Sequence, residues 1–285
     1  MELRFRGGSW DFSDGRVRLL GVLNVTPDSF SDGGRYESLE RALERGIRMA
    51  EEGADAIDVG GESTRPGSDP VSVEEELSRV VPVIESLAKS VSVPISIDTM
   101  KAEVARRAVA AGASIVNDVT AGTADEAMNS VVAGSGAGYI LMHMRGTPKT
   151  MQRAPRYDDV VAEVGTYLAA RVQAATQAGC DPRSLMVDPG IGFGKKLRDN
   201  LLLINRLETL TSLGRPILVG ASRKSFIGAI TGQTNPELRL EGTIASGLFA
   251  VRRGAIALRV HDVAPMKRAL QVWREIDRAN DGTAP

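Results

Sequence analysis

Residues 94–119, PISIDTMKAEVARRAVAAGASIVNDV, decide the fold, because they hold two apolar runs with a helical segment between them. The runs are PISIDT and SIVNDV, and each changes from apolar to polar residues toward its end. The segment between them reads as a helix that stops at Gly112, since glycine is the residue type that most often ends a helix. Strands that are apolar on both faces are typical of a parallel sheet covered by helices. This stretch therefore predicts a strand–helix–strand unit with parallel strands.

The same unit recurs along the chain. Apolar runs begin near Leu19 (LLGVLN), Asp55 (DAIDVG), Pro94, Ser114, Gly138 (GYILMHM), Ser184 (SLMVDP), Pro216 (PILVGAS) and Ala255 (AIALRVHD). Their spacing averages roughly 34 residues, the length of one strand–helix unit. Eight such units predict an α/β fold, the (β/α)8 or TIM barrel. A doubly wound sheet is the alternative, but the first run leads into NVTPDSFSDGG and lacks the GxGxxG loop of that class.

The two ends of the chain carry further expectations. In residues 1–16, apolar side chains alternate on both sides of Gly7-Gly8, which predicts a β-hairpin that plugs the N-terminal end of the barrel. The tail 280–285 (NDGTAP) is expected to be disordered. Neither a linker nor a low-complexity stretch divides the sequence, so we expect residues 1–285 to form a single domain.

The composition is that of an ordinary globular protein. Of the 285 residues, 42% are hydrophobic and 25% are charged, and the formal net charge is −1. So small a net charge gives no general attraction to nucleic acid or to an anionic membrane. The single cysteine, Cys180, excludes an internal disulfide, and the sequence shows neither a leader nor a membrane-length apolar run. We therefore expect a cytoplasmic protein that binds neither nucleic acid nor membrane.

Polar residues stand at the carboxyl ends of the eight predicted strands. They are Asn24, Asp58, Asp98, Asn117, Asp118, His143, Asp188, Ser222, Lys224, Arg259 and His261. A barrel brings its strand ends together at one mouth, which is where the active sites of this fold lie. Single members of the set have a simpler interpretation: Asp58 and Asp118 can cap the following helix, and His143 can be a packed histidine. Capping does not account for the whole set, so the mouth is the predicted active site.

Two groups of these residues differ in chemistry. Asp98, Asn117, Asp188 and Lys224 mix acceptors with donors, which suits a flat heterocycle with an N–H edge and a carbonyl, either a purine or a pterin. A second group, Asn24, Arg65, Arg259 and His261, is rich in donors and suits a phosphate or diphosphate. We expect His261 to donate hydrogen bonds to an oxyanion, with a proton for the leaving group as a further role. A bound Mg²⁺ would be held by the diphosphate, water and the amide oxygen of Asn24.

Two loops after the first two predicted strands are long for such connections. They read NVTPDSFSDGGRY and GGESTRPGSD and are rich in Gly, Pro, Ser and Asp. Long loops above a barrel mouth are typical of lids that close over a substrate.

Eight motifs, in order along the chain, resemble those of the dihydropteroate synthases. They are GVLNVTPDSFSDGG, DVGGESTRPG, SIDT, NDV, LMHMRGTPKTMQ, DPGIGFGK, GASRKSFIG and RVHDV, and they extend from the first predicted strand to the last. The resemblance implies a cytoplasmic transferase of folate biosynthesis. It would condense 6-hydroxymethyl-7,8-dihydropterin diphosphate with p-aminobenzoate to form 7,8-dihydropteroate and pyrophosphate. It also implies inhibition by sulfonamides, bound Mg²⁺ and a homodimer formed through the last helices.

The resemblance assigns site residues to each substrate. The pterin would be bound by Asp98, Asn117, Asp188, Lys224 and Arg259, with Arg259 stacked over the ring. The diphosphate would be bound by Asn24, Ser63, Thr64, Arg65, Arg259 and His261. The p-aminobenzoate would be bound by Phe30, Thr64, Pro66, Phe193, Ser222 and Lys224. The catalytic residues would be Asp98, Arg65, Lys224 and Arg259, and Asn24 would be the metal ligand.

Two alternative functions share the pterin groups. A methyltetrahydrofolate–corrinoid methyltransferase would need neither the SRKSF segment nor the GGESTRPG loop, and both are present. A non-catalytic pterin-binding paralogue should have lost Asn24, Arg65, Lys224 or Arg259, and all four are present.

Overall fold

The computed structural model describes residues 1–26 and 35–279, and the side chains of the first helix from residue 38. Its main sheet has eight parallel strands in the order β8-β7-β6-β5-β4-β3-β10-β9. The strands are β3 (Arg18–Asn24), β4 (Ala56–Gly60), β5 (Ile95–Asp98), β6 (Ile115–Asp118), β7 (Gly138–Met142), β8 (Leu185–Asp188), β9 (Leu218–Val219) and β10 (Ala257–Val260). A parallel bridge between Val187 and Ile217 joins the two ends of this order, so the sheet closes as a barrel. The predicted (β/α)8 fold is confirmed.

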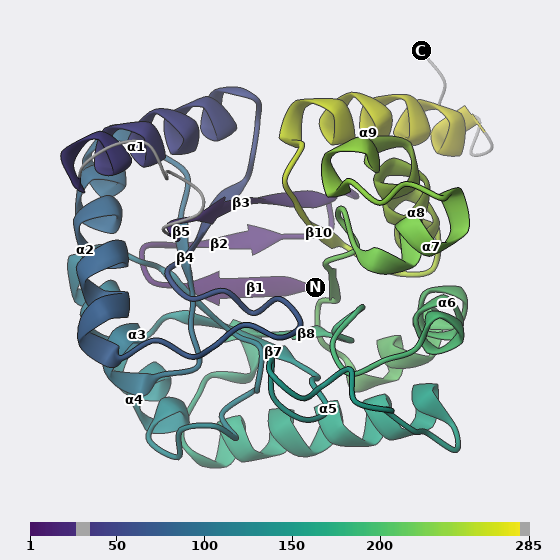
Figure 1. The fold of residues 1–285 in the computed structure, drawn as a ribbon, viewed down its shortest axis with the longest axis horizontal. Helices are drawn as coiled ribbons and strands as arrows, with labels where there is room; N and C mark the ends of the chain where they lie inside the picture. The colour runs from purple at the N-terminus through teal and green to yellow at the C-terminus, as the bar shows by residue number, and fades with distance from the viewer. Residues whose placement is uncertain (27–34, 280–285) are drawn as a thin grey trace.

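Helices follow the strands and surround the barrel (Figure 1). They are α1 (Arg35–Glu51), α2 (Val73–Ser90), α3 (Ala102–Ala111), α4 (Met128–Ser135), α5 (Val160–Gln177), α6 (Leu197–Asn205), α7 (Ser225–Thr231), α8 (Leu240–Arg252) and α9 (Val263–Arg278). Short 3-10 turns, η2 (Pro182–Ser184), η3 (Leu207–Leu213) and η4 (Pro236–Leu238), lie between some of them. The apolar faces of the helices pack on the outward side chains of the strands. Ile57, Val80, Ile84 and Leu87, for example, are fully buried in one cluster. No helix in the described ranges is long and apolar enough to cross a membrane.

The N-terminal hairpin plugs the N-terminal end of the barrel, as predicted. Strands β1 (Glu2–Phe5) and β2 (Gly8–Asp11) pair antiparallel. Leu3 and Trp10 are buried against residues at the starts of the barrel strands, among them Leu20 and Ile115. Figure 1 shows the hairpin lying across the centre of the ring of helices. The turn is one residue earlier than predicted: Gly7, with φ 87°, lies in the turn, and Gly8 already pairs with Phe5.

Two expectations fall outside the described residues. One is the disordered tail at 280–285, and the other is the position of Phe30 in the first loop.

Candidate active site

The barrel aligns its strand ends, and three of the predicted residues, Asn24, Asp98 and Asn117, fall in one register across four neighbouring strands. Asn24 of β3 pairs with Gly60 of β4, Gly60 with Asp98 of β5, and Asp98 with Asn117 of β6. Side chains at these positions therefore lie side by side at the carboxyl end of the barrel. A Cβ placed on Gly60 would lie 3.7 Å from Asn24 Oδ1 and 3.8 Å from Asp98 Oδ2. The bare glycine thus keeps an open space to which both oxygens are adjacent.

Arg259, from β10, is the centre of the charged floor of this mouth. Its Nε donates to Asp58 Oδ2 at 2.6 Å and its Nη2 donates to Asp98 Oδ2 at 2.7 Å. Asn117 Nδ2 also donates to Asp58 Oδ2, at 3.2 Å. The interpretation of Asp58 as a helix cap is therefore wrong. Asp58 lies in the middle of β4, fully buried, and pairs with a residue 201 positions away in the sequence. That mid-strand position was the sequence signal, because a residue inside a strand cannot cap the next helix.

Two carboxylate oxygens in this floor have no partner. Asp58 Oδ1 and Asp98 Oδ1 are buried, and no protein group among the described residues donates to either. A buried acceptor without a donor is unfavourable, so both atoms are suited to a ligand that brings N–H groups. Burial raises the pKa of Asp98 to about 7. The Arg259 guanidinium lowers this pKa, and the Asp58 carboxylate raises it further. A donor-rich or cationic ligand would lower this pKa and favour the charged carboxylate.

Asp188, at the end of β8, is the third carboxylate of the mouth. Its Oδ1 accepts from the N–H of Gly190 at 2.7 Å. Burial raises its pKa to about 6, and this N–H, Lys224 and Lys195 each oppose the rise. A Cβ on Gly220 would lie 3.9 Å from Asp188 Oδ2 and 3.7 Å from Arg259 Cβ. Here, too, a glycine leaves room between the polar groups of neighbouring strands.

Lys224 and Phe193 form a platform beside this floor. Lys224 is the N-cap residue of α7, and its Nζ lies 4.0 Å from the centre of the Phe193 ring. Burial lowers the pKa of Lys224 to about 8, with Arg259 and Arg65 acting in the same direction. Gly192 passes close to this lysine: its φ is +87°, and a Cβ there would lie 3.1 Å from Lys224 Cδ. An apolar ring and a cation at van der Waals distance suit an aromatic carboxylate.

Ser222 and His261 bond to each other at the rim. Ser222 Oγ lies 3.0 Å from His261 Nδ1 and accepts from the His261 backbone N–H at 3.2 Å. Burial lowers the pKa of His261 to about 3, and Arg259 and Arg223 lower it further. The imidazole is therefore neutral at physiological pH and has a single ring N–H to donate. This state suits contact with an oxyanion better than the proton transfer that we also considered.

The second predicted lid is docked onto the loop that follows β7. Gly67 N donates to Pro148 O at 3.0 Å, and Lys149 Nζ pairs with Asp69 at 2.6 Å. In this loop Pro66 and Arg65 are exposed, and Ser63 and Thr64 are half-buried. The positive charge of Arg65 lowers the pKa of Lys224, so the two side chains lie near each other. The loop is thus held on the side of the mouth where Lys224 lies.

Two residues at strand ends have structural roles. Asp118 accepts from Thr120 N at 2.7 Å and from Gly122 N at 2.6 Å, so it stabilises the turn after β6 and does not cap helix α4, as its helix-cap interpretation proposed; α4 begins after Ala127. His143 is buried, packs edge-on against Tyr167 and accepts at Nδ1 from the ammonium of Lys195, 2.9 Å away. It is therefore a packed histidine. Lys195 was not singled out in the sequence, where the glycine-rich DPGIGFGK segment gives no sign that its lysine is buried.

Few of the described side chains at the mouth could bind a metal ion. No cluster of three or more His, Cys, Asp or Glu side chains that could hold an ion occurs in the ranges described. Asn24 Oδ1 adjoins the open space above Gly60, so it could provide one oxygen ligand there. This arrangement fits Mg²⁺, which keeps most of its water and is commonly bound through substrate phosphates.

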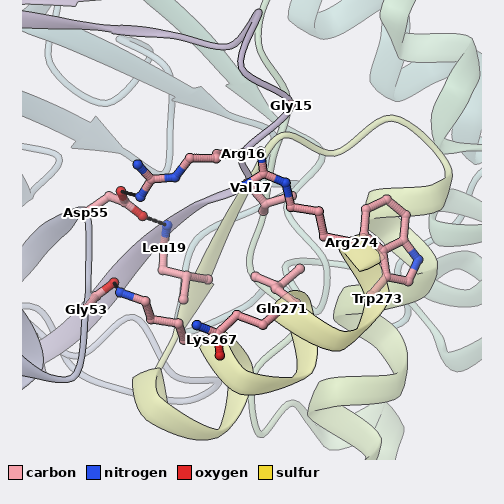
Figure 2. A pocket seen from close by; sticks show the side chains of 11 residues that line it. Gly15, Arg16, Val17, Leu19, Gly53, Asp55, Lys267, Gln271, Trp273 and Arg274 are labelled. Carbon is pink, nitrogen blue, oxygen red and sulfur yellow. Dashed lines mark hydrogen bonds and ion pairs between the residues drawn. The ribbon is translucent and has the colours of Figure 1, made fainter. Parts of the chain in front are cut away.

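A cavity of about 200 Å³ lies elsewhere, between the link that enters β3 and helix α9 (Figure 2). Its lining residues include Arg16, Asp55, Lys267 and Arg274, at the N-terminal end of the strands. Arg16 pairs with Asp55 at 3.6 Å, and Arg274 donates to a backbone carbonyl at 3.1 Å. None of the predicted site residues lines this cavity, so it is separate from the mouth.

The family of the chain follows from comparison with known proteins. Residues 20–261 match the family of pterin-binding enzymes. The dihydropteroate synthase of Escherichia coli strain K12 is 47% identical over 272 residues, which cover 95% of each chain. Two solved dihydropteroate synthases superpose with a TM-score of 0.91 and cover 97% of this chain and 99% of their own. The Xanthomonas albilineans enzyme, with 4-aminobenzoic acid, is 49% identical, and the Yersinia pestis enzyme, with a sulfonamide drug, is 41% identical. The chain therefore belongs to the dihydropteroate synthases, transferases of the pterin-binding family.

Proposed function

We propose that the protein condenses 6-hydroxymethyl-7,8-dihydropterin diphosphate with p-aminobenzoate, giving 7,8-dihydropteroate and pyrophosphate. One observation carries this assignment: the floor of the mouth has buried, unpartnered carboxylate oxygens on Asp58 and Asp98, beside a lysine–phenylalanine platform. The floor suits the N–H edge of a pterin, and the platform suits an aromatic carboxylate. A corrinoid methyltransferase has no use for that platform.

The pterin would be held by the acceptors of the floor. Asp98 Oδ1 and Asp188 Oδ2 accept from ring N–H groups, and Asn117 uses the amide oxygen that its bond to Asp58 leaves free. Lys224 donates to the ring carbonyl. Arg259 is already tied to two carboxylates, which fixes its guanidinium beneath the space for the ring. Held by these two carboxylates, the planar guanidinium of Arg259 can stack with one face on the pterin ring while its other face stays in contact with protein.

Catalysis of this reaction depends on stabilising the charges that develop on the pterin and the leaving pyrophosphate, and it requires no covalent intermediate with the protein. The bond from the pterin methylene carbon to the diphosphate oxygen breaks, and its electron pair leaves with pyrophosphate. Asp98 and Asp188 stabilise the positive charge that spreads over the pterin ring. The amine of p-aminobenzoate attacks the methylene carbon, forms the new C–N bond and gives up a proton to the departing pyrophosphate. A neutral aniline is nucleophilic enough that the site requires no strong base.

The leaving diphosphate would meet the donors at the rim. Arg65, Ser63 and Thr64 come from the lid loop, and neutral His261 would offer a ring N–H. We expect Asn24 to be a protein ligand of Mg²⁺, whose charge would neutralise part of the diphosphate when it is bound. The lid also excludes water, which would otherwise react with the pterin cation.

The p-aminobenzoate would lie on the Phe193 ring, with its carboxylate toward Lys224 and Ser222. Thr64 and Pro66 would close over it from the lid loop, joined by Phe30 of the first loop. Sulfonamides share the aromatic amine and a negatively charged group, so we propose that they compete for this position.

We further propose that the protein is a cytoplasmic homodimer joined through its last helices. Large apolar side chains are exposed on these elements: Ile230, Leu238, Phe249, Val272 and Ile276. The last two are 62% and 66% exposed and line a shallow groove on α9. A second copy of the chain would cover this face and remove its apolar surface from water. Analytical ultracentrifugation should give twice the 30.3 kDa mass of one chain.

The function is tested by measuring pyrophosphate release from the pterin diphosphate in the presence of Mg²⁺. Release should require p-aminobenzoate and should yield dihydropteroate in equal amount. Arg65→Ala should raise the KM for the pterin diphosphate, because it removes a cation from the rim. Arg153→Ala, which removes an exposed cation of the loop after β7 that forms no ion pair among the described residues, is the matched control. Absence of p-aminobenzoate-dependent release from the folded wild-type protein would refute the proposal.

A further inference from the structure

Lys195 is a buried lysine without a carboxylate partner. It ends the glycine-rich turn after β8, and only 2% of its surface is exposed. No acidic side chain of the described residues forms an ion pair with it. Burying an ammonium in this way is unfavourable unless polar groups surround it. The structure provides them: the Nζ atom lies 2.8 Å from Gly190 O, 2.9 Å from Phe193 O and 2.9 Å from His143 Nδ1.

A fourth acceptor, His143 O, lies 3.3 Å from the same atom, so acceptors are present for all three donors of the ammonium form, although burial lowers the pKa of Lys195 to about 7. His143 can accept at Nδ1 because burial lowers its pKa to about 3 and keeps the ring neutral. The side chain of Lys195 therefore joins the end of β7, through His143, to the turn after β8. Gly190 and Phe193 are the two points at which Lys195 holds this turn.

Gly190 and Phe193 connect Lys195 to two different parts of the mouth. Gly190 donates its N–H to Asp188 Oδ1 at 2.7 Å and offers its carbonyl to Lys195, so this residue is fixed through both of its backbone polar groups. Phe193 gives its backbone carbonyl to Lys195, while its ring lies under the ammonium of Lys224. One lysine thus sets the position of a pterin-pocket carboxylate and of an aromatic platform.

A second contact holds the middle of the same turn from outside. Gln152, an exposed residue of the loop after β7, donates from Nε2 to Gly192 O at 2.7 Å. This contact reaches the Phe193 side of the turn but makes no bond to Gly190 or Asp188. Its removal should therefore disturb the platform and leave the carboxylate in place.

We propose that Lys195 is a positioning residue that fixes Asp188 and Phe193 together, and so links pterin binding to p-aminobenzoate binding. This inference rests on the proposed function, since it assigns Asp188 and Phe193 to the two substrates. The role is indirect, because Lys195 is enclosed by protein and does not reach the space where a substrate would lie.

Three variants test the proposal by steady-state pyrophosphate release. Lys195→Met keeps the length and burial of the side chain but removes its donors, and should raise both KM values about tenfold. Gln152→Ala should raise the KM for p-aminobenzoate about threefold and leave the KM for the pterin diphosphate unchanged. Lys196→Met, at the exposed neighbouring position, is the control and should match wild type.

The outcomes separate this inference from the proposed function. If wild type releases no pyrophosphate, the function is wrong. If wild type is active and folded Lys195→Met has both KM values within twofold of wild type, the positioning role is wrong. Near-UV circular dichroism reports whether Lys195→Met is folded. If it is not, Lys195→Gln is measured in its place; its amide nitrogen is one bond closer to the backbone than the lysine Nζ, and both KM values within twofold of wild type in that variant overturn the proposal.

Discussion

Replacing Asp98 with asparagine should stabilise the ligand-free protein above neutral pH while it removes most of the activity. Burial raises the pKa of Asp98 from 3.8 to about 7, even though Arg259 attracts the charged form. The folded protein therefore binds the Asp98 proton more tightly than the unfolded chain does. The resulting stability is fully present below pH 3.8 and is lost as the pH rises through 7.

The size of the effect follows from this difference in pKa. The pKa of Asp98 rises by about 3, and a change of one in pKa corresponds to about 1.36 kcal/mol. Ionising Asp98 at high pH therefore costs about 4 kcal/mol of folding free energy. Asparagine cannot ionise, so it avoids this loss while keeping an oxygen for Arg259. The free energy of unfolding of Asp98→Asn, relative to wild type, should grow by about 3 kcal/mol between pH 5 and pH 8.

The measurement is urea unfolding followed by circular dichroism at pH 5, 6.5 and 8, without ligands. Glu126→Gln, which removes an exposed carboxylate, is the control and should show no such trend. Turnover by Asp98→Asn should fall about 100-fold, since roughly 3 kcal/mol of transition-state stabilisation is lost with the charge. A stability difference that is constant between pH 5 and pH 8 would refute the reasoning, because it would mean that Asp98 is already ionised in the folded protein at pH 5.

Four further outcomes are expected from other parts of the site and surface. Asp58→Asn should lower kcat/KM for the pterin diphosphate about 10-fold to 100-fold, because it replaces the ion pair with the Arg259 guanidinium by a weaker hydrogen bond to a neutral amide oxygen; unchanged kinetics would contradict the role given to this pair. Gly192→Ala should raise the KM for p-aminobenzoate about tenfold, since the new Cβ is strained at φ +87° and crowds Lys224; a KM equal to that of wild type would mean that the turn can shift freely. Ile276→Glu should give a monomer in sedimentation, and a dimer of unchanged affinity would place the interface elsewhere. Cys180 should stay unmodified by a thiol reagent in the native state, because burial raises its pKa to about 11, and rapid labelling would show that this region opens readily.

The amino-acid sequence by itself determined the elements and their order. Each predicted apolar run became a barrel strand within one or two residues, except that β9 is only Leu218–Val219. Hydrophobic periodicity is a local property, so it survives without knowledge of the fold. The sequence also placed polar residues at the strand ends. Once eight parallel strands are accepted, their ends must share one mouth, and Asn24, Asp98 and Asn117 indeed lie on neighbouring strands in register.

Only the tertiary structure decided which of those residues act on each other. By its place in the sequence Asp58 fits a helix cap, whereas in the structure it binds Arg259, 201 positions away. The acceptors around Lys195 come from His143, Gly190 and Phe193, and only the fold brings His143 to the other two. Local sequence spacing cannot show which residues pair when the partners are so far apart in the chain. Burial, which also depends on the fold, is what shifts the pKa values of these charged groups. A carboxylate in water has a pKa near 4, while Asp98 reaches about 7 because strands on both sides of it exclude the solvent.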